Sequence, residues 1–171
     1  YPLARNNKSI IGAENVTTFN YVGIAGTVGN LVTVIKLRAL ADAAISKFVY
    51  KNIILDLNGI DYLKGISAKY YTNDSYIGEV AVRNCGPNSE MLEIDKLYYT
   101  RWGSITLRNS SVFRQGKGLV LRPTTDGNSS INAHFLPKLE VTGCEDGVYI
   151  DTTVAQVNTM KIIGSVEACT N

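Results

Sequence analysis

The sequence has little net charge and no long hydrophobic run. Its 17 Lys and Arg residues nearly balance 15 Asp and Glu residues, which leaves a formal charge of +2 over 171 residues. A nucleic-acid-binding surface needs clustered basic side chains to neutralise phosphates, so no nucleic-acid partner is expected. No apolar run approaches the ~20 residues of a membrane span, so membrane insertion is not expected either.

Helical periodicity is nearly absent as well. Residues 38–45 favour a helix of a turn or two, whereas elsewhere apolar and polar residues alternate with period two. These runs are rich in Val, Ile, Thr and Tyr and are interrupted by Asn and Gly. The sequence therefore predicts an all-β chain with one domain over residues 1–171. Because it begins with Tyr1 and no basic-then-apolar leader follows, we expect a processed product or a segment of a longer chain.

Two kinds of short strand alternate along the chain. The first kind ends on Asn or Gly, which tolerate a left-handed backbone and so mark a sharp corner. Its copies occupy residues 55–59, 80–84, 105–109, 139–143 and 160–164. The second kind occupies residues 65–69, 91–95, 118–122 and 147–151. A repeat of roughly 21–34 residues that contains two or three short strands is typical of a solenoid.

The shared period favours a parallel β-helix, in which equivalent strands stack about 4.8 Å apart and their inward residues form columns. The predicted columns are Ile66, Leu92, Leu119 and Val148; Ala68, Ile94, Leu121 and Ile150; and Val80, Ile105, Leu139 and Met160. Further strand-like segments, whose register is left open before residue 48, bring the total to about six coils. The alternative is an antiparallel β-sandwich, which explains the density of strands but not two strand types with one period.

Several of these runs resemble a known family. Residues 8–12, 18–21, 51–59 and 80–85, with Gly65-Ile66 between the last two, are similar to segments of pectate-lyase-like right-handed parallel β-helices. Within that superfamily the chain most resembles the central segment of bacteriophage tailspikes and related receptor-binding tail proteins. The resemblance implies a homotrimer in the virion tail, with other tail proteins as partners and a host cell-surface glycan as ligand. In many members it also implies cleavage of that glycan, which the fold alone does not establish.

Two carboxylates on one strand are the weak candidates for catalysis. Glu93 and Asp95 have the same parity, so both should face outward about 6–7 Å apart. Glycoside hydrolysis uses such a pair, one to protonate the leaving oxygen and one to activate water or attack the sugar. A simpler interpretation is favoured, because the outward column alternates in charge and so predicts a surface ion ladder. That column contains Lys69, Asp95, Arg122 and Asp151.

Aromatic residues give the stronger functional signal. Tyr70-Tyr71-Thr72 recurs 28 residues later as Tyr98-Tyr99-Thr100, and Arg101-Trp102 follows directly. We expect the rings to lie over one another on successive coils, where they could stack on sugar faces. The predicted glycan-binding residues are Tyr71, Tyr99, Trp102, Arg101 and Lys69. The alternative is that these rings pack against the core or against a neighbouring subunit.

The cysteines and the single histidine do not suggest a metal site or a nucleophile. Cys85 and Cys144 each follow a corner residue, which places them two coils and about 9–10 Å apart, too far for a disulfide. All three thiols are therefore expected to be reduced and largely buried. His134 lies in a long insert, residues 122–137, and is expected to be a surface or loop residue. No metal ligand set and no cofactor are expected.

Three functions remain open. The first is recognition of a host cell-surface polysaccharide by a non-catalytic module during virion adsorption, with the chain acting in the tail, outside the host cell. The second is a polysaccharide depolymerase, either a hydrolase or a lyase, on the same scaffold. The third is a purely structural segment of a virion fibre. The aromatic row favours the first, whereas the second needs an acid–base pair that the sequence offers only weakly.

Overall fold

The structure is a computed structural model that describes residues 9–12, 17–38, 48–69, 75–95, 100–110, 114–123 and 130–171. Within these ranges the chain forms thirteen strands and no helix. Accordingly, none of the described segments is a helix long and apolar enough to cross a membrane.

The strands form two parallel sheets. Sheet A has the order β12-β10-β7-β5-β3, and sheet B the order β1-β4-β6-β9-β11-β13, with β2 also on β4 and β8 also on β6. The strands of sheet A are β3 (Val32–Arg38), β5 (Leu63–Lys69), β7 (Glu90–Asp95), β10 (Lys117–Leu121) and β12 (Asp146–Ile150). Those of sheet B are β1 (Ser9–Ile11), β2 (Thr17–Asn20), β4 (Val49–Asp56), β6 (Tyr76–Arg83), β8 (Arg101–Trp102), β9 (Ser104–Arg108), β11 (Ser130–Thr142) and β13 (Gln156–Glu167).

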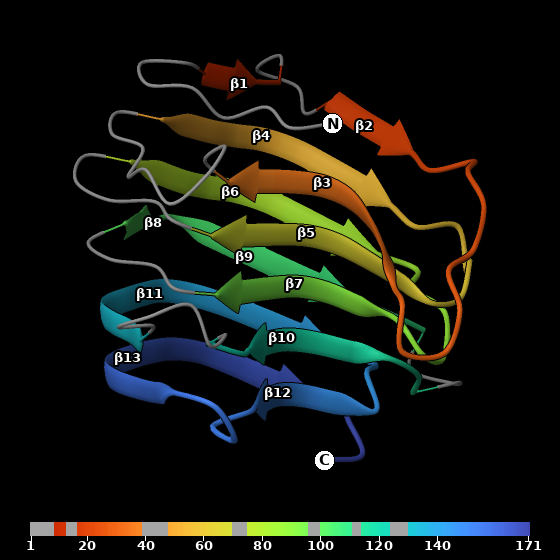
Figure 1. Ribbon diagram of the computed structural model, residues 1–171. Coiled ribbons are helices and arrows are strands. Elements are labelled where there is room, and N and C mark those ends of the chain that lie inside the picture. Colours follow the sequence, from red (N-terminus) through yellow and green to blue (C-terminus); the bar gives the residue numbers. More distant parts are fainter. Residues whose placement is uncertain are drawn as a thin grey trace.

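The chain winds alternately through the two sheets, which face each other as layers (Figure 1). Every pairing between named strands is parallel. A sandwich of hairpins would pair its strands antiparallel, so the predicted parallel β-helix is confirmed and the alternative is excluded. The solenoid has about four turns, so the expectation of six is wrong. At the N-terminal end β1 and β2 share the single neighbour β4, so these two segments add one layer to sheet B and not two.

Of the two predicted interior columns along sheet A, the first is confirmed, and the second has the predicted register but ends on Ile150, which is 54% exposed. Ile66 pairs with Leu92, Leu92 with Leu119 and Leu119 with Val148, so one inward position repeats on four successive strands. The first three of these residues are at most 2% exposed. Each aliphatic side chain is covered by the one above and the one below, so burial of this stack is a main source of stability.

The column along sheet B is confirmed for three of its four residues. Val80 pairs with Ile105 and Ile105 with Leu139. The prediction of Met160 as the fourth is wrong, because Leu139 pairs with Gly164 and Met160 pairs with the backbone of His134. Two features cause the shift: the register slips between Leu136 and Leu139, and β13 continues past Gly164. The expected loop around His134 is likewise replaced by strand β11, which has β13 as a partner.

The predicted corners are partly confirmed. Asn58, Asn84 and Gly143 have φ angles of 55°, 56° and 72°, the left-handed conformation that favours these residues. Asn109 takes another role, since its buried side-chain amide donates hydrogen bonds to the carbonyls of Cys85 (3.1 Å) and Gln115 (2.7 Å). This asparagine therefore joins two successive coils through its side chain rather than through a special backbone conformation.

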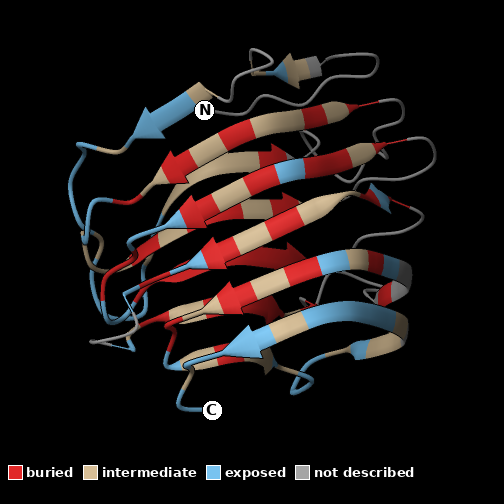
Figure 2. Cartoon of the chain, turned by 180° about the vertical axis from the view of Figure 1, so that it is seen from behind, coloured by how far each residue is buried: buried red, intermediate tan, exposed pale blue. Residues whose placement is uncertain are grey.

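The last coil is more exposed than the coils in the middle of the solenoid. Figure 2 shows β13 mostly as exposed residues, whereas the strands in the middle of the solenoid alternate between buried and intermediate. Ile162 and Val166 of β13 are 37% and 49% exposed, although their neighbours on β11, Leu136 and Val141, are fully buried. The same inward position is thus closed in the middle and open at β13, which is the edge strand of sheet B among the described residues.

A local irregularity at the start of each sheet-A strand determines what faces outward there. A Cβ atom on Gly65 or Gly118 would contact core side chains from sheet B, and Met91 at the equivalent position is fully buried. The next residue also faces inward, so two successive residues point into the core. As a result the residue before them, such as Lys64 or Glu90, faces the outer surface together with Glu93.

Candidate functional site

The outer face of sheet A carries two columns of alternating charge. The predicted column is confirmed at two of its links: Lys69 Nζ lies 3.0 Å from Asp95 Oδ2, and Arg122 Nε lies 3.3 Å from Asp151 Oδ2. A second column, which the sequence analysis missed, follows from the irregularity at the start of each strand. It contains Lys64, Glu90, Lys117 and Asp146, which are partners on successive strands.

Arg122 connects the two columns. Its guanidinium lies 2.7 Å from Glu90 Oε1 and 3.2 Å from Glu93 Oε1, in addition to its contact with Asp151. Burial alone would lower the pKa of Arg122, but the hydrogen bonds and charges of these three carboxylates outweigh it and raise the pKa. One arginine therefore holds three acidic side chains, two from β7 and one that directly follows β12, which makes this face a charge-compensated surface.

Both predicted catalytic carboxylates belong to this network. Glu93 is 6% exposed and Asp95 is 4% exposed. Lys64 and Arg122 contact Oε1 of Glu93, and the Ser67 hydroxyl donates a 2.8 Å hydrogen bond to Oε2. A general acid or a nucleophile needs an oxygen directed at the sugar, and both oxygens of Glu93 are directed at protein donors. The geometry therefore favours the ion ladder over catalysis for this pair.

The predicted glycan-binding residues do not form one row in the described part of the chain. Tyr71 and Tyr99 lie outside the described residues. Trp102 is 5% exposed and belongs to the hydrophobic core, so we assign its ring to packing rather than to glycan contact. Arg101, beside it on β8, is exposed on sheet B, whereas Lys69 is paired with Asp95 on sheet A.

A groove of about 310 Å³ lies at the corners through which the chain enters the strands of sheet A. Its walls come from the corners before four successive strands, β5, β7, β10 and β12, and from the long connection between β2 and β3. The groove thus crosses the coils rather than following one of them. The lining residues are Val28, Gly29, Leu31, Tyr62, Pro87, Asn88, Ser89, Glu90, Lys117 and Glu145.

Asp61 fixes the geometry of two groove residues. Its carboxylate accepts hydrogen bonds from the Asn88 backbone (2.6 Å), the Asn88 side chain (2.7 Å) and the Tyr62 backbone (2.8 Å). Burial raises the pKa of Asp61, but these hydrogen bonds outweigh it and hold the pKa below its usual value. Tyr62, at φ 54°, and Asn88 are therefore held in place across two successive coils.

The groove combines apolar and polar groups. Leu31, Tyr62 and Pro87 provide apolar surface, while the exposed Asn88 and Glu145 provide hydrogen-bonding groups. Such a surface can hold a polyhydroxylated ligand, because sugar rings pack their apolar faces against side chains and direct hydroxyls to polar groups.

Lys117 adds a positive charge at the groove. Its ammonium lies 3.6 Å from the centre of the Tyr149 ring and 3.9 Å from Asp146 Oδ2. A cation held between a ring face and a carboxylate keeps a defined position. The groove therefore presents one ordered ammonium beside its neutral and acidic groups.

The thiols and the acidic residues do not suggest a metal centre. Cys85 and Cys144 are buried and free, as predicted, and Cys169 is half-buried and free. Burial raises the pKa of the Cys85 thiol to about 12, which keeps it protonated. Within the described ranges, no three His, Cys, Asp or Glu side chains gather closely enough to hold a metal ion.

Comparisons with protein-family models, with curated proteins and with solved structures find no match for this chain. The parallel β-helix therefore rests on the structure itself.

Proposed function

We propose that this chain is a tailspike-like β-helix segment that recognises a host cell-surface polysaccharide during virion adsorption. The observation that carries the proposal is the amphipathic groove that crosses four successive coil corners. In this proposal the chain works as a homotrimer together with other tail proteins, in the virion tail and outside the host cell.

The shape of the groove suits a linear polymer. Successive corners of a solenoid are about 4.8 Å apart, so an extended glycan chain can meet an equivalent position on each coil. The groove is at the lower end of the roughly 300–1,000 Å³ typical of ligand pockets, which suits a short stretch of glycan. Its mixed lining supports a sugar over a hydrocarbon, because the exposed amide and carboxylate would stay hydrogen-bonded.

Depolymerase activity is the second candidate and has weaker support. It requires a carboxylate pair on either side of the scissile bond. Glu93 and Asp95 are buried in ion pairs, so the depolymerase proposal would need other carboxylates. A purely structural fibre segment is the third candidate, which the charge ladders on sheet A support.

The test measures binding and chain shortening together on a panel of bacterial surface polysaccharides. We expect the wild type to bind a polysaccharide and Tyr62→Leu or Lys117→Gln to weaken that binding by roughly five- to tenfold, since each removes one groove contact. Arg108→Gln is the matched control, because Arg108 is an exposed cation on sheet B, away from the groove. Equal binding by all three variants would remove the groove from the proposal, and absence of binding to the panel would overturn it. Release of reducing ends would favour the depolymerase instead.

A further inference from the structure

A second pocket lies inside the first coil, whereas the groove lies on the outside of the solenoid. It has a volume of about 330 Å³ and is lined almost entirely by apolar side chains. It is left open because, among the described strands, β3 is the edge strand of sheet A with no neighbour on its outer side, and β2 pairs only with β4. The lining residues are Ile10, Phe19, Asn20, Tyr21, Val34, Ile35, Tyr50, Ile53 and Leu55.

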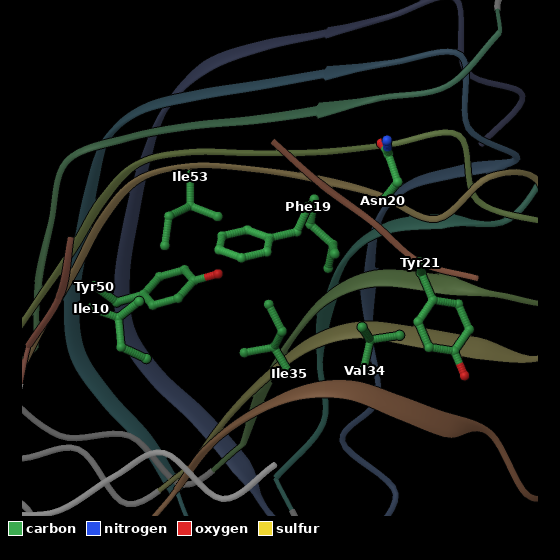
Figure 3. A pocket seen from close by; sticks show the side chains of 9 residues that line it. Ile10, Phe19, Asn20, Tyr21, Val34, Ile35, Tyr50 and Ile53 are labelled. Atoms are coloured by element: carbon green, nitrogen blue, oxygen red, sulfur yellow. The ribbon is translucent and has the colours of Figure 1, made fainter. Parts of the chain in front are cut away.

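One polar group points into this apolar space. Figure 3 shows the Tyr50 hydroxyl directed toward the centre of the pocket, between Phe19, Ile53 and Ile35. Tyr50 is 1% exposed, and its hydroxyl has no hydrogen-bond partner among the described residues. Buried hydroxyls in native proteins nearly always have a partner, so this one needs an explanation. Burial also raises the pKa of Tyr50, so the phenol stays protonated and can donate.

The other tyrosine at the pocket is different. The Tyr21 hydroxyl points away from the pocket centre and donates a 3.1 Å hydrogen bond to the Ile24 carbonyl. Among the described residues that line it, the pocket thus holds one buried hydroxyl without a partner and no charged side chain. A charged ligand would lose its hydration without compensation, whereas a neutral acceptor oxygen would satisfy Tyr50.

We propose that this pocket binds a small neutral hydrophobic molecule, whose single acceptor oxygen, as in an ether, ketone or alcohol, takes a hydrogen bond from Tyr50. The volume sets the size of the ligand. A cavity of about 150 Å³ holds benzene, so about twice that volume accommodates a two-ring or medium-chain molecule. Such a ligand is chemically unlike a polysaccharide, so this site is independent of the corner groove.

The experiment uses two probes of nearly equal shape, 2-methoxynaphthalene and 2-ethylnaphthalene, titrated into the full chain and followed by probe fluorescence. Only the first has an acceptor oxygen. We expect both to bind and the methoxy compound to bind about five- to tenfold more tightly, the value of one net hydrogen bond. Tyr50→Phe should abolish this preference. Tyr21→Phe, the matched control, should preserve the preference.

Ile35→Trp gives a second, independent readout. A larger side chain in the wall should fill the pocket and abolish binding of both probes, and circular dichroism will verify that each variant keeps the β-sheet spectrum. Failure of the wild type to bind either probe up to the solubility limit of that probe would overturn the proposal. Retention of the methoxy preference by folded Tyr50→Phe would also overturn it.

Discussion

Shortening one side chain of the core should destabilise the solenoid by an amount that depends on which coil carries that side chain. Leu119 is fully buried between Leu92 and Val148, so Leu119→Ala loses about three methylene equivalents, or ~2.4 kcal/mol, plus a cavity contribution. The total should be about 3–4 kcal/mol. Ile162 is 37% exposed on the last strand, so Ile162→Ala should lose only about 1.5 kcal/mol, because water fills the space.

The assay is urea unfolding followed by circular dichroism, with the slope of the transition checked for each variant. Leu136→Ala is the matched control, since Leu136 is the fully buried neighbour of Ile162 one coil further in. Leu136→Ala should lose as much stability as Leu119→Ala. Leu136 lies on sheet B, like Ile162, whereas Leu119 lies on sheet A, so the comparison separates the effect of the coil from the effect of the sheet. Loss of stability in Ile162→Ala as large as in Leu136→Ala would refute the reasoning that the last coil is open.

Two further predictions concern the charged groups. Arg122→Met should reduce the free energy of unfolding by about 1–3 kcal/mol, because Glu90 and Glu93 stay buried and lose a cation. The control Arg108→Met removes an exposed cation and should reduce the free energy of unfolding by less than about 1 kcal/mol. Equal losses in the two variants would contradict a stabilising role for the contacts of Arg122. Asp56 and Asp61 have folded-state pKa values below their usual ones, for Asp56 because hydrogen bonds from Asn58, Asn84 and Arg83 outweigh burial. The stabilisation that these two carboxylates provide is therefore complete above the unfolded-state pKa of about 3.9 and is lost as pH falls through their folded-state pKa values. Thermal unfolding should show Tm dropping between about pH 5 and pH 2, and a Tm that stays constant over this range would contradict the prediction.

The coils from residue 48 onward could be predicted because stacking imposes the same requirement on every turn. Ile66, Leu92 and Leu119 must all be apolar, since each one fills the space between two others. The N-terminal part could not be predicted, because β1 and β2 pair with two successive parts of the same strand, β4. No repeat in the sequence indicates that arrangement. The position of Gly164 could not be predicted either. Glycine is compatible with a corner and with the middle of a strand, and only the pairing of Gly164 with Leu139 shows which of the two it occupies.

The charged face could be predicted in part. Strict alternation places Asp95 and Arg122 outward, and the structure agrees. The same alternation places Lys64 on the side of Ile66, inward, which the structure contradicts because Gly65 also faces the core. Glycine has no Cβ, so two successive residues can turn inward there at little steric cost.

The groove could not be predicted from the sequence, for a different reason. Its walls come from corners that are far apart along the chain, such as those at Tyr62, Asn88 and Glu145. Each of these corners is an ordinary turn by itself. Only the stacking of coils brings them together, so a pattern within one repeat does not signal the groove.

The distribution of carboxylates also bears on the choice between recognition and catalysis. Glu93 and Asp95 are suitable as rungs of a ladder because they are buried and held by cations, and the same contacts keep their oxygens from a ligand. Glu145, in contrast, is exposed at the groove. A glycosidase needs a second carboxylate within about 5–10 Å of the first, and Glu90, the other acidic residue of the groove lining, is tied to Arg122. Among the described residues of the lining, one accessible carboxylate can accept hydrogen bonds from a sugar but cannot alone supply the pair that hydrolysis needs, which supports the proposed recognition of a glycan over its cleavage.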